Sequence, residues 1–136
     1  MKTIGIIGSR RRNSEADYDQ LEKAFLEIYK DGDRIVSGGC SQGGDHFAEI
    51  IAKKYQIPIT IYYAQWDKLG KRAGFARNTD IARDCNVLLA LVSDDRSGGS
   101  EDTIKKAEKM GKSIILLSKN PSSNISSEFN DSDLQI

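Results

Sequence analysis

The sequence contains few of the residues that build disulfide frameworks, metal sites or catalytic triads. Cys40 and Cys85 are the only cysteines in 136 residues, too few for a disulfide framework and without the spacing of metal ligands. His46 is the only histidine, so a Ser-His or Cys-His triad would need that single residue as its base. We therefore expect reduced thiols, no bound metal and no cofactor.

Net charge and long apolar segments are also absent from the sequence. Twenty basic residues balance twenty acidic residues, so no overall field attracts nucleic acid or an anionic membrane. The N-terminal apolar run is too short and too rich in glycine for a secretory signal, and no apolar stretch is long enough to cross a bilayer. We expect a cytoplasmic protein without a membrane partner, in which nucleic acid is disfavoured as a partner and any anion site is local.

Strand-like and helix-like segments alternate along most of the chain. Continuous apolar runs, typical of parallel strands covered on both faces, occupy residues 3–8, 34–37, 58–63, 87–92 and 113–117. Helical spacing of apolar residues follows the first two strands, at Leu21, Ala24, Phe25 and Ile28 and then at Phe47, Ile50 and Ile51. Two further helices are expected over residues 78–83 and 103–110, the second of them ended by Gly111.

This alternation predicts a three-layer, Rossmann-like α/β fold: a doubly wound sheet of five mainly parallel strands in the order 3-2-1-4-5. Sheets of this kind bind ligands beyond the carboxyl ends of their strands, where the strand order reverses. In the predicted order, that point lies between the first and fourth strands. We assign residues 1–117 to this domain. Residues 118–136 are polar, which predicts a flexible tail unless their few apolar residues pack on the sheet edge or on a partner.

The loop after the first strand carries Gly8, Ser9 and Arg10. Glycine lets a ligand approach the backbone closely, and the serine and arginine side chains can donate hydrogen bonds to an oxyanion. We therefore expect this loop to bind a phosphate. Arg11 and Arg12 are interpreted instead as part of a solvated basic run.

A glycine-rich segment follows the second strand and leads into a helix, with Gly38, Gly39 and Gly43 followed by Asp45. Free backbone N–H groups and the helix dipole at such a position favour an anion. The segment is not a Walker loop, because Gly44 and Asp45 stand where lysine and serine or threonine are required. Asp45 either caps the helix or accepts a hydrogen bond from a ribose hydroxyl.

The segment between the third and fourth strands contributes a tryptophan and an arginine. Trp66 can stack on a base or cover the apolar floor of its own loop. Residues 70–74, in which two glycines flank basic residues, could form a mobile lid over phosphates. Arg77 is the sharper candidate, because a guanidinium is always charged and grips a phosphate through two hydrogen bonds.

A glycine turn after the fourth strand opens the last helix. Gly98 and Gly99 precede the acidic residues Glu101 and Asp102, which complement the helix dipole but would repel a phosphate placed directly beside them. We therefore expect a ligand to bind the backbone of the two glycines and to keep its charge toward Arg77 and the arginine of the first loop.

Taken in order and spacing, these motifs resemble the small Rossmann-like proteins of the SLOG superfamily, and most closely its YspA-like branch. The resemblance covers nearly all of residues 1–117 and implies a nucleotide-like ligand. Relatives often dimerise, so it also implies a homodimer as a possible assembly. The ligand-binding positions expected from the loops and the resemblance are Gly8, Ser9, Arg10, Gly38, Gly39, Gly43, Asp45, Trp66, Arg77, Asn78, Gly98, Gly99, Ser100 and Thr103.

The segment that begins at Arg77 is also similar to the LOG (lonely guy) phosphoribohydrolases of the same superfamily. That similarity implies a catalytic or phosphate-gripping role for Arg77. The turn and helix after the fourth strand match the P-G-G-x-G-T-x-x-E signature of those enzymes only loosely, with Thr103 on its threonine. Lys106 stands where the catalytic glutamate would follow, and Glu101 could replace that glutamate only in a rearranged turn.

The sequence predicts a protein that binds a nucleotide or nucleotide-derived small molecule through phosphate-cradling loops at the carboxyl edge of a parallel sheet. The alternative is an enzyme, a nucleoside 5′-monophosphate phosphoribohydrolase. It would hold the phosphate with Arg77 and place Glu101 or Asp102 beside the oxocarbenium charge of N-glycosidic cleavage. A DNA-associated module, as in DprA-like relatives, is a third hypothesis, which the neutral net charge disfavours.

Overall fold

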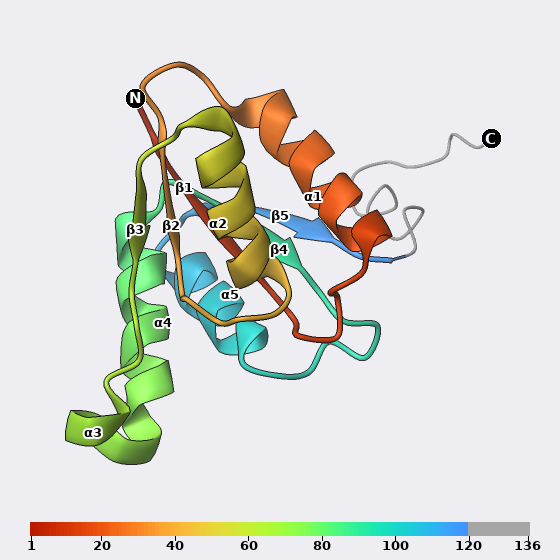
Figure 1. Ribbon diagram of the computed structural model, residues 1–136. Coiled ribbons are helices and arrows are strands. Elements are labelled where there is room, and N and C mark those ends of the chain that lie inside the picture. Colours follow the sequence, from red (N-terminus) through yellow and green to blue (C-terminus); the bar gives the residue numbers. More distant parts are fainter. Residues whose placement is uncertain (120–136) are drawn as a thin grey trace.

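A parallel five-stranded sheet lies at the centre of the computed structural model, which describes residues 1–119 (Figure 1). The strands are β1 Thr3–Gly8, β2 Arg34–Ser37, β3 Ile59–Ile61, β4 Val87–Leu91 and β5 Ser113–Leu117. Their order is β3-β2-β1-β4-β5, and each neighbouring pair is parallel. The predicted α/β class and strand order are therefore confirmed. From residue 120 onward, the predicted tail lies outside the described residues.

Helices cover both faces of this sheet (Figure 1). Helices α1 Glu15–Ile28 and α2 Gly44–Tyr55 pack on one face, and α4 Ala73–Asp84 and α5 Ser100–Lys109 pack on the other. A short helix, α3 Trp66–Leu69, and a 3-10 turn, η1 Gly70–Arg72, precede α4 and protrude beside its first turn. Within residues 1–119, none of the helices combines the length and the apolar character needed to cross a membrane.

Successive strand residues alternate between two apolar layers. Ile4 and Leu89 belong to the layer that contains Phe25 of α1. Leu88 belongs to the opposite layer, which contains Ile81 of α4. Each of these side chains is at most 1% exposed. Because both faces of the sheet are covered, the strands are apolar at successive positions, which is why continuous apolar runs predicted them.

Three details of the predicted helices are wrong. The helix expected over residues 103–110 spans Ser100–Lys109, because the polar residues of its first turn carry no apolar signal. The helix expected over residues 78–83 already begins at Ala73, whose small side chain is buried and gives no strong apolar signal. Ile50, predicted on the buried stripe of α2, is 38% exposed. The inner face of that helix is occupied instead by residues such as Ile51 and Ala52, which leaves Ile50 outside the apolar layer.

Arg12 is buried, which contradicts its interpretation as part of a solvated basic run. Its side chain is 2% exposed, and its Nε donates to Asp17 Oδ1 at 2.7 Å. Its Nη1 donates to the carbonyl oxygens of Val92 at 2.7 Å and Leu117 at 2.8 Å, and its Nη2 donates to the side chain of Gln20. The several N–H groups of a guanidinium make this possible. Arg12 thereby joins the loop after β1 to α1 and to the ends of β4 and β5.

Asp33 holds the start of β1 against the turn before β2. Its carboxylate accepts hydrogen bonds from the backbone N–H groups of Lys2 at 2.8 Å and Lys30 at 2.9 Å, and from Lys2 Nζ at 2.5 Å. Burial raises the pKa of this carboxyl, but the hydrogen bonds outweigh burial and lower the pKa to about 2. The folded protein therefore favours the charged form of Asp33.

The free energy of unfolding should depend on this carboxylate in acid. Because the folded pKa lies below the ordinary value of 3.8, the stabilisation is present above pH 3.8 and is lost as the pH falls through about 2. We expect Asp33→Asn to cost about 2 kcal/mol at neutral pH and the difference to shrink toward pH 2. Urea unfolding across this pH range measures it. Asp31→Asn, at an exposed neighbouring position, should match the unmodified protein, and a pH-independent cost of Asp33→Asn would contradict the prediction.

Candidate functional site

A cavity of about 350 Å³ opens at the carboxyl end of the sheet, next to the adjacent strands β1 and β4. The strand order reverses between these two strands, where doubly wound sheets bind their ligands. We call this space the first cavity. Of the predicted ligand-binding residues, its lining contains Gly8, Ser9, Arg10, Asp45, Arg77, Asn78, Gly98, Gly99, Ser100 and Thr103.

The other predicted site residues lie outside this lining, namely Gly38, Gly39, Gly43, Trp66 and Glu101. Trp66 is 59% exposed, and a Cβ on Gly74 would lie 3.4 Å from its ring. The tryptophan therefore lies beside the start of α4 and outside the first cavity. Residues 70–74, expected as a lid, form η1 Gly70–Arg72 and the start of α4 and do not line the first cavity.

Glycines bring the start of α2 into backbone contact with the end of β1. A Cβ on Gly44 would lie 2.4 Å from the Ile7 carbonyl oxygen, and a Cβ on Gly8 would lie 2.9 Å from the Gly44 nitrogen. Gly43 has a φ of 76°, and a Cβ there would lie 2.4 Å from the Ser9 carbonyl oxygen. These distances leave no room for a side chain. The glycines at the start of α2 therefore serve close packing, which sets the helix against the cavity wall.

Arg77 is fixed in the wall of the first cavity by its neighbours. Its Nη1 donates to the Gly38 carbonyl at 2.7 Å, and its Nε donates to Asn78 Oδ1 at 2.9 Å. Asn78 is buried, and its Nδ2 donates to Asp102 Oδ2 at 3.1 Å, which joins α4 to the first turn of α5. Among residues 1–119, no hydrogen-bond acceptor contacts Arg77 Nη2. That nitrogen is therefore available to a ligand.

The turn before α5 presents backbone donors to the first cavity. Gly98 has a φ of 106°, and nothing lies within 4 Å of a Cβ built on Gly98 or Gly99. In the part of the chain that the structure describes, the N–H groups of Gly98, Gly99 and Ser100 donate to no protein acceptor. Free N–H groups at a helix N-terminus, where the dipole is positive, favour an anion.

The acidic residues at the start of α5 form ion pairs outside the cavity lining. Glu101 accepts two hydrogen bonds from Arg96, at 2.8 and 2.9 Å. Asp102 Oδ2 accepts one from Lys106 Nζ at 2.7 Å. Because each carboxylate has a cation beside it, the repulsion expected between these acids and a phosphate at Gly98 is reduced. Lys106, at the position of the LOG glutamate, does not line the first cavity.

Arg11 lines the first cavity, and its side chain is 57% exposed, in agreement with its interpretation as a solvated residue. Its terminal nitrogens donate to both carboxylate oxygens of Asp95, each at 3.1 Å, and its Nη2 donates to Ser97 Oγ at 2.8 Å. Hydrogen bonds from Arg11, Ser97 and Ser93 hold the pKa of Asp95 well below its usual range. This cluster joins the loops after β1 and β4. The sequence signal for this cluster was a cation, Arg11, after one strand and an acid, Asp95, after the strand predicted to lie beside it.

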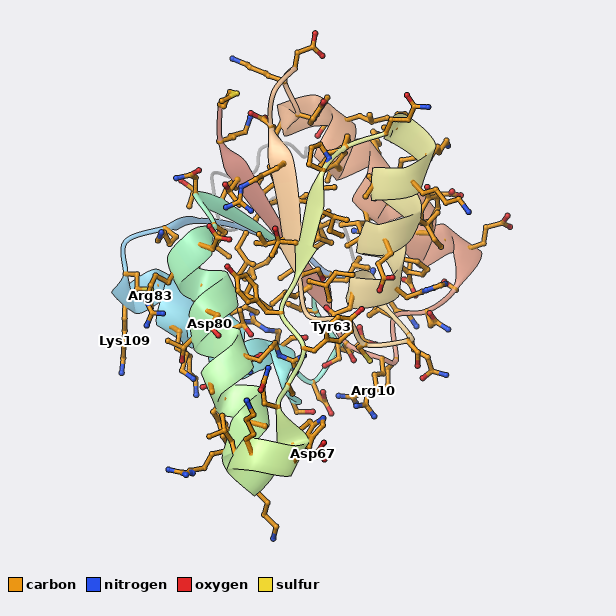
Figure 2. The ribbon with its side chains drawn as sticks, turned by 60° about the vertical axis from the view of Figure 1, so that its left-hand side comes forward. Arg10, Tyr63, Asp67, Asp80, Arg83 and Lys109 are labelled. Carbon is orange, nitrogen blue, oxygen red and sulfur yellow. The ribbon has the colours of Figure 1, made fainter. Side chains whose placement is uncertain are left out.

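Positive charge exceeds negative charge in the lining of the first cavity. Among the described residues, the lining contains Arg10, Arg11 and Arg77 but a single carboxyl group, Asp45, and of the three arginines Arg11 is paired with Asp95. Arg10 is exposed and has no hydrogen bond or ion pair within residues 1–119. Figure 2 shows its side chain extending away from the ribbon at the end of the sheet. The cavity is therefore suited to an anion.

Asp45 lies in the first turn of α2 with its side chain buried. It does not cap the helix, because the N-cap is Gly43 and no side-chain cap hydrogen bond is present. Its carboxylate accepts a hydrogen bond from the Cys40 N–H at 3.1 Å and lies 3.2 Å from the Ser37 hydroxyl. Burial raises the pKa of Asp45, although Cys40, Arg77 and Ser37 act in the opposite direction.

The fold and the first cavity define a Rossmann-like α/β protein with a cationic cavity at the switch point of its sheet. Comparisons of the chain with protein-family models, with curated proteins and with solved structures find no match. The resemblance to the SLOG superfamily therefore rests on the sequence motifs alone. Within residues 1–119, no group of three or more His, Cys, Asp or Glu side chains is placed to hold a metal ion.

Proposed function

We propose that the first cavity binds the phosphate of a nucleotide or nucleotide-derived ligand. One observation carries the proposal: the unpaired Nη2 of Arg77 and the unpaired N–H groups of Gly98, Gly99 and Ser100 share one lining. Phosphate oxygens readily accept hydrogen bonds from guanidinium groups and from the free N–H groups at helix N-termini.

Three further features support this proposal. Arg10 adds an unpaired cation to the lining. The volume of about 350 Å³ falls within the range of about 300–1,000 Å³ that is usual for small-molecule sites. The SLOG-like motifs imply a nucleotide-like ligand. Because the chain has no net charge, its affinity for an anion must arise from these local groups.

Cleavage of the N-glycosidic bond is the alternative, and it would require a carboxylate beside the developing positive charge. Glu101 and Asp102 pair with Arg96 and Lys106 and do not line the first cavity. Asp45 does line it, but its carboxylate already accepts a hydrogen bond from the Cys40 N–H at 3.1 Å and lies 3.2 Å from the Ser37 hydroxyl. We therefore propose binding without hydrolysis. If the protein released adenine from AMP, that result would support the hydrolase alternative instead of binding alone.

We expect Arg10→Ala to weaken AMP binding about tenfold, because a charged hydrogen bond contributes about 1.5 kcal/mol. The side chain is exposed and unpaired within residues 1–119, so its removal should leave the fold intact. Arg83→Ala is the matched control, since it removes an exposed arginine of α4 outside the cavity. Isothermal titration calorimetry measures both affinities. Equal losses in the two variants would show that Arg10 acts only through overall charge.

Calorimetry of the unmodified protein with AMP, ADP-ribose, NAD and a cyclic nucleotide tests the proposed function itself. We expect binding heat with at least one of these ligands, and a smaller heat with the Arg77→Ala variant. A folded sample that gives no heat with any of them would contradict the proposal.

A further inference from the structure

Lys106 lies on α5, outside the lining of the first cavity, and contacts both α4 and α5. Its Nζ donates to Asp102 Oδ2 at 2.7 Å and to the Phe75 carbonyl oxygen at 2.8 Å. The same nitrogen lies 5.4 Å from the centre of the Phe75 ring. The side chains of Lys106 and Asp102 are each 26% exposed. The ammonium group is therefore held by groups on two helices, which distinguishes this ion pair from one on open surface.

Asp102 connects Lys106 to the wall of the first cavity through Asn78. Asp102 Oδ2 accepts a hydrogen bond from Asn78 Nδ2 at 3.1 Å as well as the one from Lys106. Because a carboxylate only accepts hydrogen bonds, it fixes the Asn78 amide with Nδ2 toward α5. The amide oxygen is then left to accept the hydrogen bond from Arg77 Nε at 2.9 Å. Asp102 thereby fixes the position of Arg77, the residue whose Nη2 is available to a ligand.

The charge of Asp102 would by itself oppose an anion in the first cavity. Asn78 Nδ2 donates to the Gly99 carbonyl oxygen at 3.4 Å, so Asp102 and the glycine turn share one amide nitrogen as their donor. The N–H groups of that turn belong to the proposed phosphate site. A negative charge so close to them repels a phosphate unless a cation cancels it. Asp102 can therefore orient Asn78 without opposing the ligand only while Lys106 is paired with it.

We infer that Lys106 is a positioning residue for phosphate binding. From outside the cavity it neutralises Asp102, and Asp102 in turn orients Asn78 and Arg77. This inference rests on the proposed function, because it takes the phosphate site as given. It assigns part of the affinity of the first cavity to a residue that does not line it, and it gives a role in binding to the lysine that stands at the position of the LOG glutamate.

Calorimetry with AMP, ADP-ribose and NAD identifies which of the three binds the unmodified protein most tightly, and that ligand is then titrated into the variants. Lys106→Met keeps an apolar stem beside Phe75 but removes the charge, and we expect it to weaken binding about fivefold. Lys106→Arg keeps the charge and the donors and should stay within about twofold. Lys109→Met is the matched control, because it removes an exposed lysine of α5 outside the cavity, and it should also stay within about twofold.

Adding Asp102→Asn to Lys106→Met separates neutralisation from a simple tether between the two helices. The double variant should recover to within about twofold of the unmodified protein, because asparagine is neutral and its oxygen still accepts from Asn78. Circular dichroism checks that each variant is folded, and Lys106→Gln replaces Lys106→Met if the latter does not fold.

A double variant that binds as weakly as Lys106→Met would overturn the inference, since Lys106 would then only tether α4 to α5. An unchanged affinity of the folded Lys106→Met variant, or an equal loss in Lys109→Met, would also overturn it and leave the phosphate site standing. If none of the three ligands binds the unmodified protein, the proposed function fails and the inference with it.

Discussion

Arg12→Met is expected to lower the free energy of unfolding by about 3–5 kcal/mol, because it removes one partner of a buried ion pair. Burial raises the pKa of Asp17, and the hydrogen bonds from Arg12 and Ser14 at present outweigh it. Without Arg12, Asp17 is left as a buried carboxylate that lacks its cation. The Val92 carbonyl also loses its charged donor, and an unsatisfied buried acceptor costs about 1–3 kcal/mol, whereas the Leu117 carbonyl keeps the hydrogen bond from the Val92 N–H at 3.0 Å.

Urea unfolding followed by circular dichroism measures this loss. Arg83→Met is the matched control, because that side chain is 66% exposed, and it should stay within about 0.5 kcal/mol of the unmodified protein. Adding Asp17→Asn to Arg12→Met should recover part of the loss, since it removes the unpaired charge. A loss below about 1 kcal/mol would show that Arg12 does not hold α1 to the ends of β4 and β5.

Gly44→Ala is expected to cost about 3 kcal/mol or more, because the new methyl group meets backbone atoms. Its Cβ would lie 2.4 Å from the carbonyl carbon and oxygen of Ile7 and 2.5 Å from the Gly8 nitrogen. These atoms belong to β1, which is held between β2 and β4 and cannot move aside. Helix α2 would have to shift instead, and the buried side chains of Phe47 and Ile51 would lose contacts in their apolar layer.

Gly74→Ala is the matched control for Gly44→Ala, since both glycines lie in the first two residues of a helix. A Cβ on Gly74 would meet only the Trp66 ring, at 3.4 Å. Alanine is favoured over glycine in a helix, so this variant should be as stable as the unmodified protein or up to about 1 kcal/mol more stable. Thermal unfolding should give a melting temperature about 10 °C lower for Gly44→Ala. Equal melting temperatures for the two variants would contradict the packing described for α2.

The strands were predictable because burial on both faces leaves a continuous apolar run in the sequence itself. All residues of β4 Val87–Leu91 are buried, and no knowledge of their neighbours is needed to recognise such a run. The burial of Arg12 could not be predicted in this way. Its carbonyl acceptors, Val92 and Leu117, lie 80 and 105 residues away along the chain, so its surroundings exist only after the sheet has formed.

The position of the first cavity followed from topology, because adjacent β1 and β4 bring the loops of Gly8 and Gly98 to one edge of the sheet. Topology did not predict which glycines serve helix packing and which leave space for a ligand. Gly44 is excluded from carrying a side chain by backbone atoms, whereas Gly98 faces open space, and only interatomic distances distinguish the two. The pairing of Arg11 with Asp95 did not follow from the sequence either, since the two residues are 84 positions apart along the chain.

A crystal structure of the protein with AMP, or with whichever nucleotide binds most tightly in calorimetry, tests the central claim most directly. We predict phosphate density in the first cavity, at about 2.7–3.2 Å from Arg77 Nη2 and from the N–H groups of Gly98, Gly99 and Ser100. A nucleotide bound elsewhere on the protein, with no phosphate in the first cavity, would contradict it.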